Sequence, residues 1–185
     1  MRRRDLIRYL GLGSVAVTIP EAMHAVPAAA TTLCSDKKTK PISGSWFEFQ
    51  HSAAEGGYWN EALAHFTADQ WRRKVFEIRE VGMEYLVLMG VARAGKPFYP
   101  SKIAPRIPMG CDDPLEAVLS AADECGIKFF VSNDFWGDLD AYNMMLDKGV
   151  QTVRFQAMEE IAERYSHHAC FYGWYFPNEA MLQPY

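Results

Sequence analysis

The chain has 185 residues and a formal net charge of −4, and 49% of its residues are hydrophobic and 14% aromatic. This hydrophobic content is sufficient for a folded core. The acidic balance argues against a nucleic-acid partner, because such a partner requires a basic surface. The four cysteines, at positions 34, 111, 125 and 170, lack the spacing of a metal-binding motif. We expect neither a bound metal nor a cofactor.

Residues 1–30 have the composition of an export signal. They carry four arginines and two acidic residues, then an apolar stretch, then Ala28, Ala29 and Ala30 as a cleavage site. Arg3 and Arg4 lie in a pattern that resembles the twin-arginine signal, and the alternative is an ordinary Sec signal with extra charge. The apolar stretch is too short for a stable transmembrane helix. We therefore expect a periplasmic or extracellular protein without a lipid anchor or stable membrane insertion.

After a polar linker at residues 31–42, a first strand is predicted at 43–50. Its alternation places Trp46, Glu48 and Gln50 on one face and the phenylalanines between them on the other. A long loop, residues 51–66, follows and contains Tyr58 and Trp59.

The first helix is predicted from Thr67 to Gly82, because Thr67 and Gln70 form a capping box ahead of apolar residues at helical spacing. A buried strand at residues 84–91 and a proline-rich loop at 92–111 come next. The second helix begins at Asp113, with proline at its first position, and ends at Gly126.

A third strand is predicted at residues 127–134, with Asn133 and Asp134 at its end and Trp136 beyond. The third helix is predicted from about residue 150 to about 165, with Phe155 in its buried stripe. His167 and His168 follow, and we interpret them as structural groups at the helix end rather than as metal ligands. Cys125 and Cys170 could form a disulfide after export, or remain buried thiols.

The last strand is predicted at residues 170–179, an aromatic run that ends in Pro177, Asn178 and Glu179. Strict alternation puts Phe171, Tyr175 and Glu179 on one face. Ligands bind at the carboxyl ends of strands in α/β folds, so Asn178 and Glu179 are candidates for chemistry. The alternative is that they only cap a turn.

The order of elements, with short turns before strands and long loops after them, predicts an α/β fold. A doubly wound sheet and a (β/α)8 barrel share this order, but no glycine-rich phosphate loop follows the first strand. We therefore predict the N-terminal half of a (β/α)8 TIM barrel, four strands and three helices at residues 43–185, apparently truncated after strand four. Such a half-barrel is expected to self-associate, because its edge strands are unpaired.

Four segments carry a family resemblance: 44–50, 98–101, 113–117 and 171–179. They resemble an uncharacterised bacterial family of glycoside-hydrolase-like TIM barrels, of the type called domain of unknown function 4434. Asn178 and Glu179 are also similar to the Asn-Glu pair at strand four of clan A glycosidases. This resemblance implies that Glu179 is the acid/base and that Asn178 binds the sugar 2-hydroxyl. The clan's nucleophile, a second Glu after strand seven, has no counterpart in this chain.

The sequence thus predicts an exported glycoside-hydrolase-like protein with a carbohydrate substrate. The alternatives are a non-catalytic carbohydrate-binding barrel and an inactive truncated product. In addition to Glu179, we expect the substrate to contact the following residues: Asn178, Trp136, Trp59, Tyr58, Glu48, Gln50, Asp134 and Asn133. Trp59 and Trp136 could equally pack over the core instead of contacting a sugar.

Overall fold

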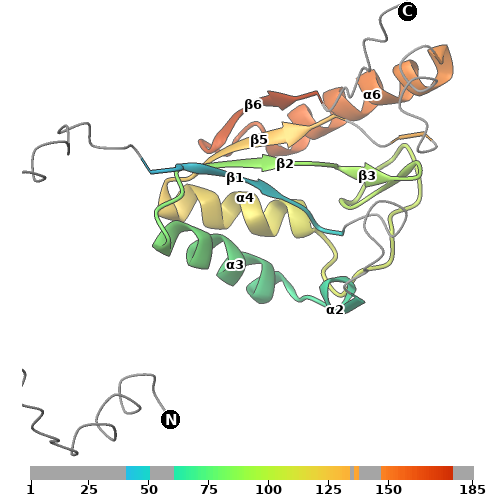
Figure 1. Cartoon of the computed structure of the whole chain (residues 1–185). Helices are drawn as coiled ribbons and strands as arrows, with labels where there is room; N and C mark the ends of the chain where they lie inside the picture. Colours follow the sequence, from blue (N-terminus) through green and yellow to red (C-terminus); the bar gives the residue numbers. More distant parts are fainter. Residues whose placement is uncertain (1–40, 51–60, 134–135, 138–146, 177–185) are drawn as a thin grey trace, which may run out of the picture. The chain divides into compact units, whose positions relative to one another are not determined.

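The structure is a computed structural model of the chain, and it describes residues 41–50, 61–133, 136–137 and 147–176 (Figure 1). All of these belong to one compact unit, Pro41–Tyr185. Within the described part of the chain, no helix is both long enough and apolar enough to cross a membrane.

The described elements follow one another in the order strand, helix, strand, with a small hairpin inserted after the second long strand. Their bounds are β1 (Gly44–Phe47), α2 (Glu61–Ala64), α3 (Ala68–Glu80), β2 (Tyr85–Leu88), β3 (Ala92–Arg93), β4 (Lys96–Pro97), α4 (Pro114–Cys125), β5 (Lys128–Ser132), α6 (Lys148–Tyr165) and β6 (Phe171–Tyr175).

The central sheet has four parallel strands in the order β1-β2-β5-β6, which is also their order in the chain (Figure 1). In a doubly wound sheet, the order of the strands across the sheet reverses at one point relative to their order in the chain. The order of these four strands does not reverse. The predicted parallel α/β architecture is therefore confirmed. The strands themselves are shorter than the sequence predicted, since β1 ends at Phe47 and β2 at Leu88.

The helix starts follow from local capping. Thr67 caps α3 and exchanges hydrogen bonds with Gln70, as the capping box predicts. Asp113 accepts a hydrogen bond from the backbone of Glu116 at the start of α4, and Gly126 ends that helix in the left-handed region with φ 72°.

The third predicted helix, α6, exists, but its buried face differs from the prediction. Phe155 is 61% exposed, whereas Arg154 and Glu160 are buried together with Ile161 and Tyr165. The hydrophobic pattern was misleading here because the two buried charged residues have partners in distant segments. Arg154 donates to Asn133, and Glu160 accepts from the loop before α4.

Two elements were missed in segments predicted as loops. One is the short helix α2, and the other is the antiparallel hairpin β3–β4. The hairpin turns through Ala94 and Gly95, which both have positive φ, as a two-residue type I′ turn requires. The turn was not predicted because Ala-Gly differs from the usual Asn-Gly signal for a turn of this type.

One hydrophobic core lies between the sheet and the helices α3, α4 and α6. Its sheet side is built from alternate residues of the strands, such as Leu86 and Phe129, which are paired in register and fully buried. Val131 belongs to this side as well, with no exposed surface.

The pairing of β5 with β6 contains a register shift. Phe129 pairs with Phe171, and the next residue, Phe130, pairs with Gly173. Tyr172 is left over, which breaks the strict alternation predicted for this strand. Phe171 therefore lies on the helix side with Trp174, at a ring distance of 5.3 Å, and does not share the face of Tyr175.

Candidate functional site

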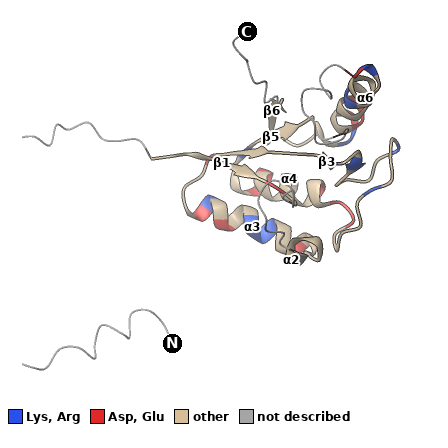
Figure 2. Cartoon of the chain, turned by 45° about the vertical axis from the view of Figure 1, so that its right-hand side comes forward, with Lys and Arg blue, Asp and Glu red and all other residues tan. Residues whose placement is uncertain are grey.

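The side of the sheet opposite the helices is here called the open face. No described element covers it. Its residues are Trp46, Tyr85, Val87, Lys128, Phe130, Tyr172 and Tyr175. Trp46 and Tyr172, on the two outermost strands, are 57% and 55% exposed, which is a large exposed fraction for aromatic side chains. Lys128 is the only charged residue in the four strands, which are otherwise drawn as uncharged residues in Figure 2. The other residues of the open face are apolar or aromatic.

At the carboxyl end of the open face, Trp46 of β1 contacts Tyr175 of β6. Their ring centroids are 5.0 Å apart and the rings are tilted by 57°. The two strands are the outermost strands of the sheet, with β2 and β5 between them. In a flat sheet three strand spacings amount to about 14 Å. The contact therefore requires the open face to be concave.

Glu48 and Gln50 follow β1 at the same end of the sheet. Phe49 is 1% exposed and contacts Trp71 of α3, so it points to the helices just as Phe47 does. Continued alternation places Glu48 and Gln50, both half-buried, on the side of Trp46. Glu48 takes part in further interactions, so its carboxylate is not an isolated group.

At the amino end of the open face, two tyrosines surround a lysine. The ammonium of Lys128 lies 4.7 Å from the ring of Tyr172 and 5.3 Å from that of Tyr85. Such cation–π contacts stabilise the charge above the aromatic faces. The open face thus has a cationic amino end, while Trp46 and Tyr175 form an aromatic pair at its carboxyl end.

Asn133, a predicted sugar contact, points away from the open face. Its side chain is 2% exposed, its Oδ1 accepts a hydrogen bond from Arg154 at 3.2 Å, and its Nδ2 contacts the sulfur of Met158. Both partners belong to α6. In this structure Asn133 connects the end of β5 to a helix.

Trp136 was predicted as either a sugar platform or a core residue. It is 5% exposed, and its ring lies 6.5 Å from Tyr99, which is itself fully buried. The indole therefore belongs to the core in this structure. The remaining predicted contacts, Tyr58, Trp59, Asp134, Asn178 and Glu179, lie outside the described residues.

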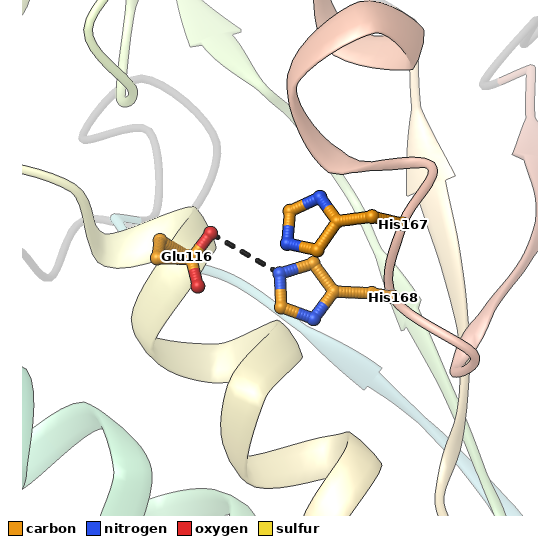
Figure 3. Close-up of side chains that lie close together, drawn as sticks. All are labelled: Glu116, His167 and His168. Atoms are coloured by element: carbon orange, nitrogen blue, oxygen red, sulfur yellow. Dashed lines mark hydrogen bonds and ion pairs between the residues drawn. The ribbon is translucent and has the colours of Figure 1, made fainter.

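A second group of titratable side chains lies on the helix side, where α4 meets the turn between α6 and β6 (Figure 3). We call it the histidine cluster, and it consists of Glu116, Asp123, His167 and His168. His168 Nδ1 lies 2.7 Å from Asp123 Oδ2, and its Nε2 lies 3.1 Å from Glu116 Oε2. His167 stacks on His168 with ring centroids 4.1 Å apart.

The hydrogen bonds of His168 shift the pKa values of the groups in this cluster. Burial alone would lower the pKa of His168, but its hydrogen bonds to Asp123 and Glu116 outweigh burial and raise that pKa. Burial likewise would raise the pKa values of Glu116 and Asp123, and the bonds from His168 lower them instead. A charged imidazole between two carboxylates is therefore favoured.

The cysteines that the structure describes, Cys111, Cys125 and Cys170, are free thiols. The disulfide considered between Cys125 and Cys170 is not formed. Cys170 instead donates its thiol hydrogen to the carbonyl of Leu119 at 3.3 Å, and burial raises its pKa.

Sequence reasoning missed the contact between Trp46 and Tyr175, and it also missed the histidine cluster. The alternation of residues 44–50 places Trp46 on one face of its strand. No sequence pattern predicts that this face contacts Tyr175, which lies 129 positions later in the chain. Likewise, Glu116 and Asp123 are seven residues apart and share one side of a helix, but their histidine partner lies 45 residues beyond Asp123.

Comparison with known proteins gives a family and a fold. Residues 42–185 match the model of a family described as domain of unknown function DUF4434. The fold is similar to the crystal structure of a putative alpha-L-fucosidase from Bacteroides thetaiotaomicron VPI-5482, with a TM-score of 0.52 and 14% identity. The alignment covers 84% of this chain and 46% of the other, so this chain spans about half of that protein.

A second structure, an alpha-L-fucosidase GH29 from Bacteroides thetaiotaomicron, aligns with a TM-score of 0.45 and 17% identity over 73% of this chain and 38% of the other. No curated protein matches the sequence at a significant level.

Proposed function

The chain belongs to the DUF4434 family, and from this premise we propose that it is an exported, glycoside-hydrolase-like protein that acts on carbohydrate. The observation that carries this proposal is the aromatic carboxyl end of the open face, where the exposed Trp46 lies against the half-buried Tyr175. Fold similarity to a structure named as a fucosidase supports the class of substrate, and it does not identify the sugar.

An accessible tryptophan beside a tyrosine suits a sugar ring. The apolar C–H groups on one face of a pyranose pack against an indole, while the phenol hydroxyl provides a hydrogen-bonding group at the edge. Glu48, predicted on the same face as Trp46, adds a carboxylate that can accept hydrogen bonds from sugar hydroxyls. We propose that the substrate lies across Trp46 and Tyr175.

Glu179 is proposed as the general acid/base, with Asn178 beside it as a contact to the 2-hydroxyl. Glu179 follows Tyr175 by four positions, so an extended continuation of β6 would place both on the open face. A general acid must stay protonated near neutral pH, and apolar surroundings favour this by raising the pKa of a carboxyl group. The second carboxylate that hydrolysis requires has no assigned residue in this chain.

The concave open face also supports the half-barrel architecture. In a (β/α)8 barrel the strands follow one another in chain order, the helices cover the outside, and the inner face is concave. The described sheet has chain order and helices on one side only. We propose that the open face is the inner wall of a barrel, which further βα units or a second copy of the chain would complete.

Binding is tested with glycan arrays followed by calorimetry on the full chain. Trp46→Ala should reduce affinity for the best glycan by at least about tenfold, which corresponds to a loss of about 1.4 kcal/mol. Phe155→Ala is the matched control, since Phe155 is an exposed aromatic on α6 and lies outside the open face. Equal affinity of the Trp46 variant and the wild type would remove the open face as the carbohydrate site.

Catalysis is tested with Glu179→Gln, on aryl glycosides that include an L-fucoside. If Glu179 is the acid/base, turnover of substrates with poor leaving groups should fall by about 10²–10⁴-fold while glycan affinity is retained. Glu159→Gln, at an exposed position on α6, is the control. Carbohydrate binding without turnover in the wild type would instead support the alternative, a non-catalytic binding barrel.

A further inference from the structure

We propose that Glu116, His167 and His168 bind a divalent first-row transition-metal ion such as Zn²⁺. The site would connect the first turn of α4 to the turn between α6 and β6 (Figure 3). It lies on the helix side of the sheet and is separate from the proposed carbohydrate site on the open face.

The three side chains converge on one point. One ligand atom from each of them lies within 4.8 Å of the others. The carboxylate of Glu116 and Nε2 of His168 are already 3.1 Å apart. Two ligand atoms that bind one zinc at about 2.0–2.1 Å in tetrahedral geometry are about 3.3 Å apart, so this pair needs almost no rearrangement.

His167 supplies the third ligand and can move to do so. Its imidazole is exposed and stacks on His168, with no hydrogen bond assigned to it among the described residues. Figure 3 shows both imidazoles extending from the turn toward Glu116. Charge pairing with Glu116 and Asp123 accounts for the position of the His168 side chain. It does not account for the position of His167, which a role as a metal ligand would explain.

The second layer of contacts has the arrangement expected around a metal. A metal-binding histidine generally donates a hydrogen bond from its other ring N–H, often to a carboxylate, and this bond fixes the tautomer and the ring orientation. Asp123 occupies that position, 2.7 Å from Nδ1 of His168. Ser120 donates to Oε1 of Glu116 at 2.8 Å, which directs Oε2 toward the histidines. Both innermost ligands are thus oriented by side chains that do not themselves bind the ion.

A neighbouring combination, Asp123, His168 and Cys170, also has three possible ligands but suits a metal less well. Oδ1 of Asp123 already accepts the backbone N–H of Cys170 at 2.6 Å. The thiol of Cys170 is buried and donates to Leu119, so its thiolate would lack access. Two imidazoles and one carboxylate, with a water at the fourth position, is the arrangement that the geometry favours.

The alternative is that a proton, rather than a metal, bridges His168 and the two carboxylates. The two cases are separated by titrating the full chain, purified without a histidine tag and treated with a chelator, with Zn²⁺ in a calorimeter. We expect one equivalent to bind and the thermal midpoint to rise. Co²⁺ should bind at the same site and give the visible absorption bands of a tetrahedral complex.

His167→Asn is the decisive variant, because the residue is exposed and its loss should leave the fold intact. We expect Zn²⁺ affinity to fall by at least about tenfold, and Asp123→Asn to weaken it by about 10–100-fold through the loss of orientation. His65→Asn, at an exposed histidine outside the cluster, is the matched control. Absence of Zn²⁺ binding to the wild type, or equal affinity of the His167 and His65 variants, would overturn the proposal.

Discussion

The carboxylate of Glu160 on α6 accepts a hydrogen bond from the hydroxyl of Tyr99, 3.1 Å away and 61 residues earlier in the chain. The same carboxylate accepts from the hydroxyl of Ser101 at 2.5 Å and from the backbone N–H of Lys102 at 2.7 Å. Glu160 therefore connects the loop between β4 and α4 to α6. A buried charge with three donors is satisfied, but its removal leaves all three donors without their acceptor.

We expect Glu160→Ala to lower the free energy of unfolding by about 3 kcal/mol, because it leaves buried donors unpaired and opens a small cavity. Urea denaturation followed by circular dichroism measures the change. Glu159→Ala, at the exposed neighbouring position, should stay within about 0.5 kcal/mol of the wild type. Similar losses in both variants would show that the loop does not depend on this carboxylate.

Asp113 has two roles, and a double-mutant cycle can separate them. It caps α4 through the N–H of Glu116, and its two carboxylate oxygens lie 3.0 and 2.9 Å from the hydroxyl of Tyr165. Tyr165→Phe should cost about 1.5 kcal/mol, and Asp113→Ala should cost more because it also removes the cap. We expect the double variant to cost about 1 kcal/mol less than the sum of the two single variants. Strict additivity would mean that the two side chains do not interact in solution.

Two glycines are required for different reasons. Gly126 has φ 72°, and a Cβ added there would meet nothing within 4 Å, so Gly126→Ala should cost only the backbone strain of about 1 kcal/mol. A Cβ on Gly110 would lie 2.6 Å from the backbone oxygen of His65, so Gly110→Ala must separate the loop from the end of α2. We expect the larger loss at Gly110, in thermal melts of the two variants. The reverse order would contradict this packing.

The helices were predictable because their signals are local. Thr67 with Gln70, and Asp113 ahead of Pro114, mark helix starts within four residues of sequence, and the structure places α3 and α4 where these caps predict. The buried face of α6 was not predictable in this way. Phe155 is exposed and Glu160 is buried, because the partners of Glu160 lie about 60 residues away and no periodicity reveals them.

The candidate site depended still more on long-range geometry. Alternation groups residues within one strand, as it did for Trp46, but the contact of Trp46 with Tyr175 results from the curvature of four strands. The register shift at Tyr172 is equally invisible in a run of aromatic residues, since any of them could be the extra one. Sequence patterns therefore identified the faces and not the contacts between them.

Thiol accessibility should distinguish the cysteines. Cys125 is half-buried, whereas Cys111 and Cys170 are about 5% exposed, and burial raises the pKa of the Cys111 thiol. In a Cys34→Ser background, we expect a maleimide at pH 7 to modify Cys125 at least tenfold faster than the other two thiols, as measured by mass spectrometry of digested protein. Urea should abolish the difference. Equal rates in the native protein would contradict the burial of Cys111 and Cys170.

The export prediction concerns residues 1–30, which lie outside the described residues. If the twin-arginine route is used, replacement of both Arg3 and Arg4 by Lys should retain precursor in the cytoplasm of a bacterial host. Cell fractionation and immunoblotting measure the ratio of precursor to mature protein. Unchanged export of the double variant, together with sensitivity to Sec inhibition, would assign the segment to the general secretory route.

The chain order of the sheet also determines how it can be assembled during synthesis. The paired residues of adjacent strands are 41, 43 and 42 positions apart, at Gly44 with Tyr85, Tyr85 with Lys128 and Phe129 with Phe171. Each new strand of the sheet therefore pairs with the strand before it, which has already emerged from the ribosome. At about 5–20 residues per second, one such unit emerges in about 2–8 s, far longer than a helix needs to form. The sheet can thus grow vectorially, with each new strand adding at the edge of the strand made before it.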